Sequence, residues 1–436
     1  MKKNFTLNVK QIFDLALENQ NKKNLIQAKK LYKKVIEIDP KLLEAQYNLG
    51  VISEEFKNYD EAIKYFNKVI NLNPSFIYSY NNLGLIYNKL GKYKKSIEYL
   101  TKLKKLNPQY VNTYNNLGIA YLSLGQYKNA IENFIFALNI DEKNSSSLYN
   151  LIQALRFYIP ETNNPIIEVS KNLKDLNKNI NFEKLLINQN DLVSFFNSAY
   201  FHKNKIKNLS FSNFFETQIY RQNTIDLNCG RHHDVFNRRN IIPKFCFGCF
   251  KVQIEPINIL NLIKLYLIFD NFNFPQNNLR KCLIELRPGI QGTYKGIIYC
   301  SSLEEAEKVL IDLSPLLDKY LKYKSNIRRG CSEFYSVFPK FKNIKKNEND
   351  FMKYQEKWRK IENYEDRNNP YKKSTLLNSL QGLSVSDLMI IDQWLYYASI
   401  IGDKSIQDLK LPIVKSDYID YKMTNQKEFR ISEFES

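Results

Sequence analysis

Four residues near the middle of the chain have the types and the spacing of a metal site. Two residues separate Cys229 from His232, and two separate Cys246 from Cys249. Two such pairs, each in a tight turn, can supply the four ligands of a tetrahedral zinc ion. The phenylalanines that flank these cysteines, Phe247 among them, favour a second interpretation in which the thiols are small apolar core groups. Zinc stays one of two open interpretations, and the sequence indicates no other cofactor.

The same segment carries histidines and arginines that could serve an enzyme. His232 or His233 would act as a general base, and an arginine clamp would bind an anionic group. The clamp would consist of Arg231, Arg238 and Arg239, which Arg287, Arg328 and Arg329 could join. A solvated loop accounts better for a polar run of this kind. The chain lacks the phosphate-binding loop, the dinucleotide fingerprint and the serine elbow of common enzyme classes. Whether the chain is an enzyme stays open, with no catalytic residue assigned and a binding protein favoured.

The elements that would position these residues alternate between strands and helices. The order strand-helix-strand-strand-helix-strand over 244–340 is the ferredoxin-like arrangement of an α+β domain. In that topology the first two strands run parallel, and a hairpin reverses the third. Cys331, at the start of the expected fourth strand, should lie at the edge opposite to Cys246 and Cys249. The expected strands cover 247–255, 281–287, 295–300 and 328–337, and the expected helices cover 257–269 and 302–313, with a break at Pro315.

The first third of the chain repeats a pattern every 34 residues. Each repeat has two short amphipathic helices, with glycine or alanine where the helices cross and proline where the second helix ends. The repeated positions are Leu15, Leu49, Leu83 and Leu117, then Pro40, Pro74 and Pro108, and the segments Asn48-Leu49-Gly50, Asn82-Leu83-Gly84 and Asn116-Leu117-Gly118. This pattern resembles the tetratricopeptide repeat, which implies a superhelical α solenoid. We expect four repeats and a capping helix (145–158) in a solenoid over 9–158.

Asparagine occupies a fixed position in the first helix of the repeats. The resemblance implies that this part of the helix lines the concave surface of the solenoid. An asparagine side chain offers both donors and an acceptor, which match the amides of an extended peptide. The alternative is that asparagine only caps or solvates the helix surface. The sequence thus predicts an adaptor that binds an extended segment of another protein through Asn48, Asn81, Asn82, Asn115, Asn116, Asn150, Tyr47 and Tyr78.

The net charge of +19, from 64 basic and 45 acidic residues, raises the question of a polyanionic partner. Many lysines fall in the second helix of a repeat, for example Lys29, Lys30, Lys33 and Lys34. We expect that helix to present a solvated outer face, and no RNA-binding aromatic motif or helix-turn-helix signature accompanies the charge. The pattern therefore argues against nucleic acid as the partner.

The remaining segments complete the expected organisation. The sequence shows no signal peptide and no run of about 20 apolar residues, so it predicts no membrane span and a cytoplasmic protein. Residues 159–243 should form a helical or irregular connector, and residues 341–436 a helical C-terminal extension. The alternative to the adaptor is an enzyme, or a metal or redox protein, that uses the Cys/His-rich segment 229–249 on a protein recruited by the repeats.

Overall fold

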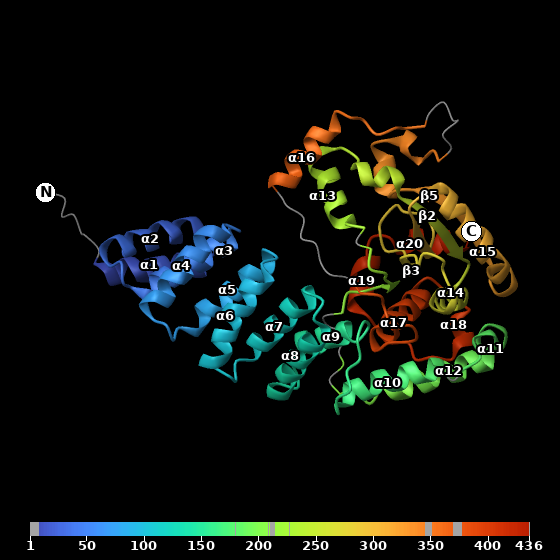
Figure 1. The fold of residues 1–436 in the computed structure, drawn as a ribbon, viewed down its shortest axis with the longest axis horizontal. Helices are drawn as coiled ribbons and strands as arrows, with labels where there is room; N and C mark the ends of the chain where they lie inside the picture. The colour runs from blue at the N-terminus through green and yellow to red at the C-terminus, as the bar shows by residue number, and fades with distance from the viewer. Residues whose placement is uncertain are drawn as a thin grey trace. The chain divides into compact units, whose positions relative to one another are not determined.

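Two compact units make up the chain in the computed structural model, and Figure 1 shows the fold. The units are Met1–Leu151 and Ile152–Ser436, and each is described by itself. Among the described residues, no helix is both long and apolar enough to span a membrane. The structure describes residues 8–178, 180–207, 209, 214–225, 227–344, 351–368 and 377–435.

The first unit is a stack of antiparallel helix pairs, drawn from blue to teal in Figure 1. Its helices are α1 (Val9–Asn21), α2 (Leu25–Ile38), α3 (Leu43–Glu55), α4 (Tyr59–Leu72), α5 (Ile77–Lys89), α6 (Tyr93–Leu106), α7 (Val111–Ser123), α8 (Tyr127–Ile140) and α9 (Ser145–Ala154). The four pairs expected from the 34-residue period are confirmed, and α9 follows them where a capping helix was expected. Helix α8 ends in the same phase as the others although Glu142 stands where they have proline.

Glycine in the Asn-Leu-Gly segments lets the two helices of a repeat pack closely. A Cβ atom on Gly50, Gly84 or Gly118 would lie less than 3.0 Å from a side chain of the paired second helix. Because protein interiors are close-packed, a larger residue would force the helices apart. These positions therefore belong to the core of each repeat. The side chains that fill the space are Phe66, Leu100 and Phe134, all fully buried.

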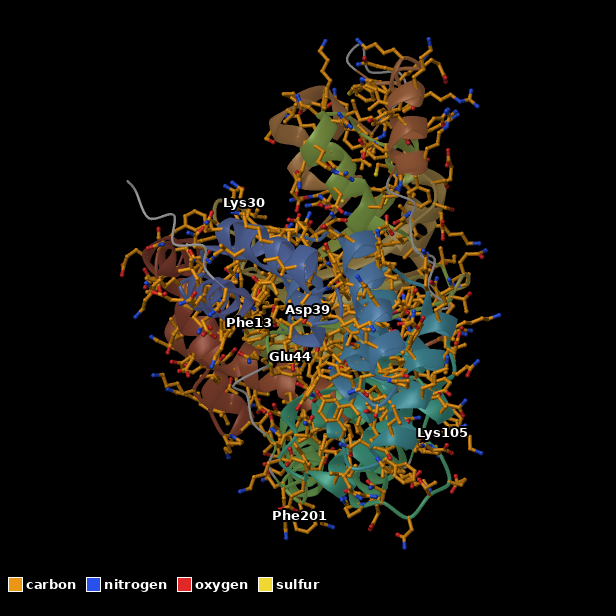
Figure 2. All side chains as sticks on the ribbon, turned by 90° about the vertical axis from the view of Figure 1, so that its left-hand side faces the viewer. Phe13, Lys30, Asp39, Glu44, Lys105 and Phe201 are labelled. Carbon is orange, nitrogen blue, oxygen red and sulfur yellow. The ribbon has the colours of Figure 1, made fainter. Side chains whose placement is uncertain are left out.

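The lysines of the second helices lie on the surface of this unit, as the sequence predicts. Lys30 in α2 and Lys105 in α6 are exposed, and Figure 2 shows both at the outside of the stacked helices. Lys29 and Lys33 of α2 both pair with Glu61 of α4 in the next repeat. The positive charge is spread over a solvated surface and is balanced in part by neighbouring acids.

The second unit is built on a five-stranded antiparallel sheet. Its strands are β1 (Gln218–Arg221), β2 (Phe250–Pro256), β3 (Arg280–Ile284), β4 (Tyr294–Cys300) and β5 (Tyr323–Arg329), in the spatial order β1-β3-β4-β2-β5. Helix α14 (Ile259–Asn271) connects β2 to β3, and α15 (Leu303–Tyr320) connects β4 to β5. The predicted order of strands and helices is present, whereas the edge strand β1 was not predicted.

The two faces of the sheet differ in chemistry. On one face Val252, Ile254 and Ile298 are fully buried. A Cβ atom on Gly296 would lie 2.5 Å from Leu265, so α14 covers this face closely. Because side chains alternate along a strand, the opposite face carries a different set of residues, and that set is polar and basic. It includes Tyr220, Lys251, Lys281, Lys295, Tyr299 and Arg328.

The segments expected as a connector and as a C-terminal extension are parts of this same unit. They supply α10 (Pro165–Lys178), α11 (Phe182–Ile187), α12 (Gln189–Lys203), α13 (Cys229–Arg239), α16 (Trp358–Asn368), α17 (Val385–Ile400), α18 (Ile406–Leu409), α19 (Asp417–Met423) and α20 (Lys427–Glu435). The unit also contains the short 3-10 helices η1 (Lys244–Gly248), η2 (Ser332–Ser336) and η3 (Pro339–Lys342). Arg221 of β1 pairs with Asp270 of α14 and Asp387 of α17, and all three are buried. Lys203 of α12 pairs with the buried Asp392 of α17. Buried ion pairs therefore join segments that are far apart in the sequence.

The predicted break at Pro315 is wrong, because α15 continues through this proline to Tyr320. Leu313 and Leu317, on either side of it, are fully buried. Packing of both turns against the rest of the unit keeps the helix continuous despite the hydrogen bond that proline cannot make.

The predicted position of Cys331 is also wrong. Strand β5 ends at Arg329, so Cys331 follows the strand instead of starting it. Because β5 runs antiparallel to β2, with Arg329 opposite Phe250, Cys331 lies at the same edge of the sheet as Cys249. The error arose because the polar strand β5 was expected later in the chain, over the more apolar segment 328–337.

Candidate functional sites in the solenoid and beside the sheet

The asparagines predicted to bind a peptide lie on α3, α5, α7 and α9, and they form hydrogen bonds between neighbouring repeats. In each bonded pair the two residues are 35 positions apart, so the contact recurs with the repeat. This recurrence gives the asparagine pattern a structural cause that the sequence did not reveal. The amide nitrogens of Asn82, Asn116 and Asn150 donate respectively to the hydroxyl of Tyr47 (3.2 Å), to Asn81 (3.2 Å) and to Asn115 (2.9 Å).

These bonds use part of the capacity of the amides. Asn81 and Asn116 are buried, so they serve the packing of the solenoid. Asn48 donates to the hydroxyl of Tyr32 at 3.0 Å. An asparagine amide has more donors and acceptors than one such bond uses, so the half-buried members keep capacity for a ligand. The half-buried members are Asn48, Asn82, Asn115 and Asn150.

An aromatic cluster lies beside these amides. The side chain of Tyr78 is 49% exposed, although it is a large and partly apolar group. Its ring centroid lies 5.6 Å from that of Phe76 and 6.4 Å from that of Tyr47. An exposed aromatic ring beside half-buried amides can add apolar contact area to hydrogen bonds with a bound chain.

The four residues predicted to bind zinc are not gathered into a metal centre. Cys229 and His232 lie in α13, Cys246 lies in η1, and Cys249 directly precedes β2. Among the residues that the structure describes, no three of these four have ligand atoms within 4.8 Å of one another. The ring of His232 is buried and stacks on Phe245, with 5.1 Å between the centroids.

The apolar interpretation of the two later cysteines fits the structure better. Cys246 packs in a hydrophobic cluster that includes Val235, Phe334 and Phe341. Burial raises the pKa of Cys249 to about 11, and it raises the pKa of Cys246 further. A buried thiol packed among aliphatic and aromatic side chains is a small apolar core group.

Three of the arginines predicted to form an anion clamp lie in α13 and are paired with acids of α16. Arg238 and Arg239 both pair with Glu365, whose side chain is almost fully buried. Arg231 pairs with Asp366. Their charges thus hold α13 against α16 and are not gathered around an empty site.

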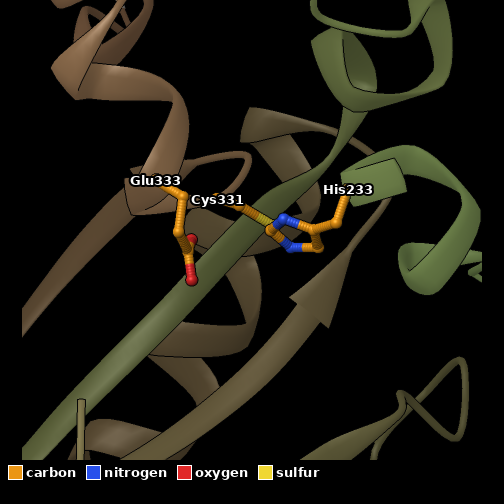
Figure 3. Close-up of side chains that lie close together, drawn as sticks. All are labelled: His233, Cys331 and Glu333. Carbon is orange, nitrogen blue, oxygen red and sulfur yellow. The ribbon is translucent and has the colours of Figure 1, made fainter. Parts of the chain in front are cut away.

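The structure instead brings together His233, Cys331 and Glu333, whose ligand atoms lie within 4.8 Å of one another. Figure 3 shows the imidazole of His233 directed toward the sulfur of Cys331, with the Glu333 carboxylate nearby. The ammonium group of Lys251 in β2 lies 3.1 Å from the same sulfur. Of this cluster, the sequence had pointed only to His233.

The cluster borders a cavity of about 400 Å³ on the sheet face that α14 does not cover. The described lining residues come from all five strands and the start of α13. They also come from the connections between β1 and α13 and between β3 and β4, and from the turn after β5. The lining is basic, because Glu333 is its one acidic residue in the described chain. Its basic residues, besides His233, are Lys251, Lys281, Arg287, Lys295 and Arg328.

The electrostatics of the cluster favour a charged sulfur. Burial alone would raise the pKa of Cys331, but the hydrogen bond with His233 and the charge of Lys251 bring it below the ordinary thiol value. The hydrogen bond with Cys331 raises the pKa of His233. Burial would also raise the pKa of Glu333, but a backbone hydrogen bond and the charge of Arg287 lower it. The arrangement favours a thiolate beside an imidazolium and an ammonium.

Comparison with solved structures finds helical-repeat proteins of low sequence identity. A MamA fragment (41-end) from Desulfovibrio magneticus RS-1 shares 20% sequence identity with this chain. The match covers 34% of this chain and 82% of the fragment, with a TM-score of 0.33. YrrB, described as a TPR protein with an unusual peptide-binding site, shares 21% sequence identity, and the match covers 34% of this chain and 76% of YrrB, with a TM-score of 0.31. PilF of Pseudomonas aeruginosa shares 19% sequence identity, and the match covers 46% of this chain and 90% of PilF, with a TM-score of 0.34. Each likeness concerns less than half of the present chain.

Comparison with protein families separates the two units. No curated protein matches the chain. No family model matches the second unit. Models described as tetratricopeptide repeat match residues 12–42, 43–76 and 76–143, in agreement with the 34-residue period and the helix pairs. The first unit of this chain is therefore a solenoid of tetratricopeptide repeats, a fold of proteins that bind other proteins.

Proposed function

We propose that the solenoid is an adaptor that binds an extended segment of another protein along its first helices. The observation that carries the proposal is the row of half-buried amides on α3, α5, α7 and α9, with the exposed ring of Tyr78 beside them. Their bonds to neighbouring repeats hold the amides at a regular spacing, which suits the regular amides of an extended chain. The proposal includes a cytoplasmic location, as expected from the sequence.

The proposal for the second unit is a ferredoxin-like core with an added edge strand. The spatial order β3-β4-β2-β5, with antiparallel pairing throughout, supports it. Helices α14 and α15 each connect two strands of this core, as the arrangement requires. Strand β1 then extends the sheet beyond β3.

A double variant of the full chain, Tyr78→Ala with Asn82→Ala, tests the adaptor proposal. Loss of one aromatic contact and one amide should weaken partner binding by about 2 kcal/mol, roughly thirtyfold in Kd. The measurement is quantitative capture of partners from native extract by the immobilised protein. Lys105→Ala, an exposed change on a second helix, is the matched control and should retain the partners. An unchanged partner set in the double variant would refute binding along the first helices.

A further inference from the structure

The position of Cys331 is fixed by the turn that follows β5. Gly330 has φ +56, a left-handed conformation that glycine adopts without strain. Its amide donates to the carbonyl of Cys249 at 2.7 Å, which ties the turn to the start of β2. A Cβ atom on Gly330 would lie 2.5 Å from Phe341, so another residue would have to displace that ring. The chain therefore leaves the strand sharply and places Cys331 beside the basic cavity.

Aromatic packing positions His233 against this turn. The rings of Phe236 and Phe334 lie 4.8 Å apart between centroids, which holds α13 against η2. The ring of His233 lies 5.6 Å from that of Phe334. Helix α13 is thus held where its histidine meets Cys331, and η2 carries Glu333 to the same place.

The surroundings of the Cys331 sulfur supply the groups that a nucleophilic cysteine needs. A nucleophile needs a base within hydrogen-bond reach and a third group that orients the base. The imidazole of His233 is directed toward the sulfur of Cys331, and Glu333 belongs to the same cluster, in which the ligand atoms lie within 4.8 Å of one another. Arg287 pairs with Glu333 and also with Glu285, which holds the carboxylate in place. Cys331 and His233 therefore have the positions of a nucleophile and its base, with the Glu333 carboxylate close to both.

The position of Lys251 argues against a metal ion at these three residues. Its ammonium group lies 3.1 Å from the Cys331 sulfur and is directed at the electron pairs that a metal would use. A divalent cation there would also face the other cations of the cavity, which repel it. The same charges stabilise a thiolate and attract an anion.

Lys281, a cation of the cavity, contacts only neutral groups within the part of the chain that the structure describes. Lys281 donates to the side-chain oxygen of Gln218 at 2.8 Å and approaches the hydroxyl of Tyr220 at 3.4 Å. In contrast, Arg287 and Lys295 pair with Glu285. Lys281 is thus the cation whose charge is most available to an anionic ligand in the cavity.

We propose that Cys331 is the nucleophile of an acyl-transfer site whose substrate carries an anionic group beside Lys281. The sulfur attacks the acyl carbon, so that a carbon–sulfur bond forms and the bond to the leaving oxygen or nitrogen breaks. His233 gives its proton to the leaving group. Water then loses a proton to His233 while its oxygen attacks the thioester carbon, which releases the acid and restores the thiolate. The reaction requires no oxidant, metal or further cofactor.

Two aryl esters, p-nitrophenyl hydrogen adipate and p-nitrophenyl acetate, test this proposal on the full-length protein. The first ester is anionic at its far end and the second is neutral. We expect nitrophenolate release and an acyl adduct on Cys331, located by peptide mass spectrometry. The ratio of the acylation rate with the anionic ester to that with the acetate ester should be about tenfold higher for Cys331 than for the reference thiol N-acetylcysteine. A factor of ten corresponds to about 1.4 kcal/mol of charge attraction. Lys281→Met should remove this preference.

Further variants separate catalysis from folding. Cys331→Ala should abolish the adduct, whereas Lys308→Ala, an exposed change in α15 away from the cavity lining, should retain it. His233→Asn should slow acylation at least tenfold while circular dichroism stays unchanged. The proposal fails if Cys331 is acylated no faster than N-acetylcysteine, if both esters react with the same relative rates as with N-acetylcysteine, or if the purified protein holds one zinc ion that Cys331→Ala removes.

Discussion

The solenoid and the sheet unit bring their candidate functional residues together by different means. In the solenoid, Asn81 meets Asn116 because each repeat reproduces the same helix one step further along. In the sheet unit, His233, Lys251 and Cys331 come from a helix, a strand and the turn after the last strand. A period in the sequence reveals the first kind of site. The second kind becomes visible only when the pairing of the strands is known.

The largest difference between the two units is expected when a buried ion pair of the sheet unit is removed. Arg221→Ala would leave Asp270 and Asp387 buried without their shared cation, at a cost of about 3–5 kcal/mol. Hydrogen exchange followed by mass spectrometry should show lost protection across Ile152–Ser436. Peptides of the solenoid should keep theirs. Equal loss in both units would contradict the division of the chain into two compact units.

Acid should affect the sheet unit through Glu285. Burial alone would raise the pKa of Glu285, but Arg287 and Lys295 hold it at about 2, below the ordinary value of 4.5. Because the folded pKa is the lower one, this carboxylate stabilises the fold above about pH 4.5. That contribution, about 3 kcal/mol, disappears as the pH falls toward 2.

Urea unfolding of Glu285→Gln at several pH values checks this expectation. The variant should be less stable than the wild type at pH 7, and the difference should shrink as the pH falls below 4.5. A difference that stays constant down to pH 2.5 would show that the ion pairs of Glu285 do not control the acid response.

In the solenoid, stability should be most sensitive to a change where two helices of a repeat pack closely. In Gly84→Ala, the added methyl group would overlap Leu100 and cost about 1–3 kcal/mol. Because a repeat contacts mainly its neighbours, lost protection in hydrogen exchange should centre on α5 and α6. Gly230→Ala in α13, where a Cβ meets nothing within 4 Å, is the control and should not lower stability. Loss of protection spread evenly through both units would contradict this local effect.

The smallest effect is expected from a single amide between repeats. Asn82→Ala removes the hydrogen bond to Tyr47 and should lower stability by about 1 kcal/mol in urea unfolding. If the amide also binds a partner, affinity should fall together with stability. A loss of stability with full partner affinity would assign Asn82 to packing alone.

The sequence predicted the solenoid well because its elements and contacts are local. The helix pairs, the close crossings at Gly50, Gly84 and Gly118, and the surface lysines all follow from the period and the residue types. The hydrogen bonds between asparagines did not follow, because the spacing alone cannot tell a bond between neighbouring repeats from a free surface.

The second unit was predicted less well because its decisive contacts are not local. The strand order could be expected, but the polar β5 was placed too late, which moved Cys331 to the wrong edge. The spacing of three cysteines and a histidine favoured the zinc interpretation. The sequence feature associated with the proposed site is Gly330-Cys331, a glycine followed by a cysteine at the end of a strand. Lys251 could not be connected with Cys331 until β2 and β5 were paired.

Site-specific photocrosslinking tests the central claim, binding along the first helices, most directly. The photoreactive p-benzoylphenylalanine would replace Tyr78, which is 49% exposed in the first helix α5, or Phe136, which is 52% exposed on the second helix α8. In native extract, the account predicts crosslinks to a partner protein from position 78 and none above background from position 136. Crosslinks of equal yield from both positions, or from position 136 alone, would contradict it.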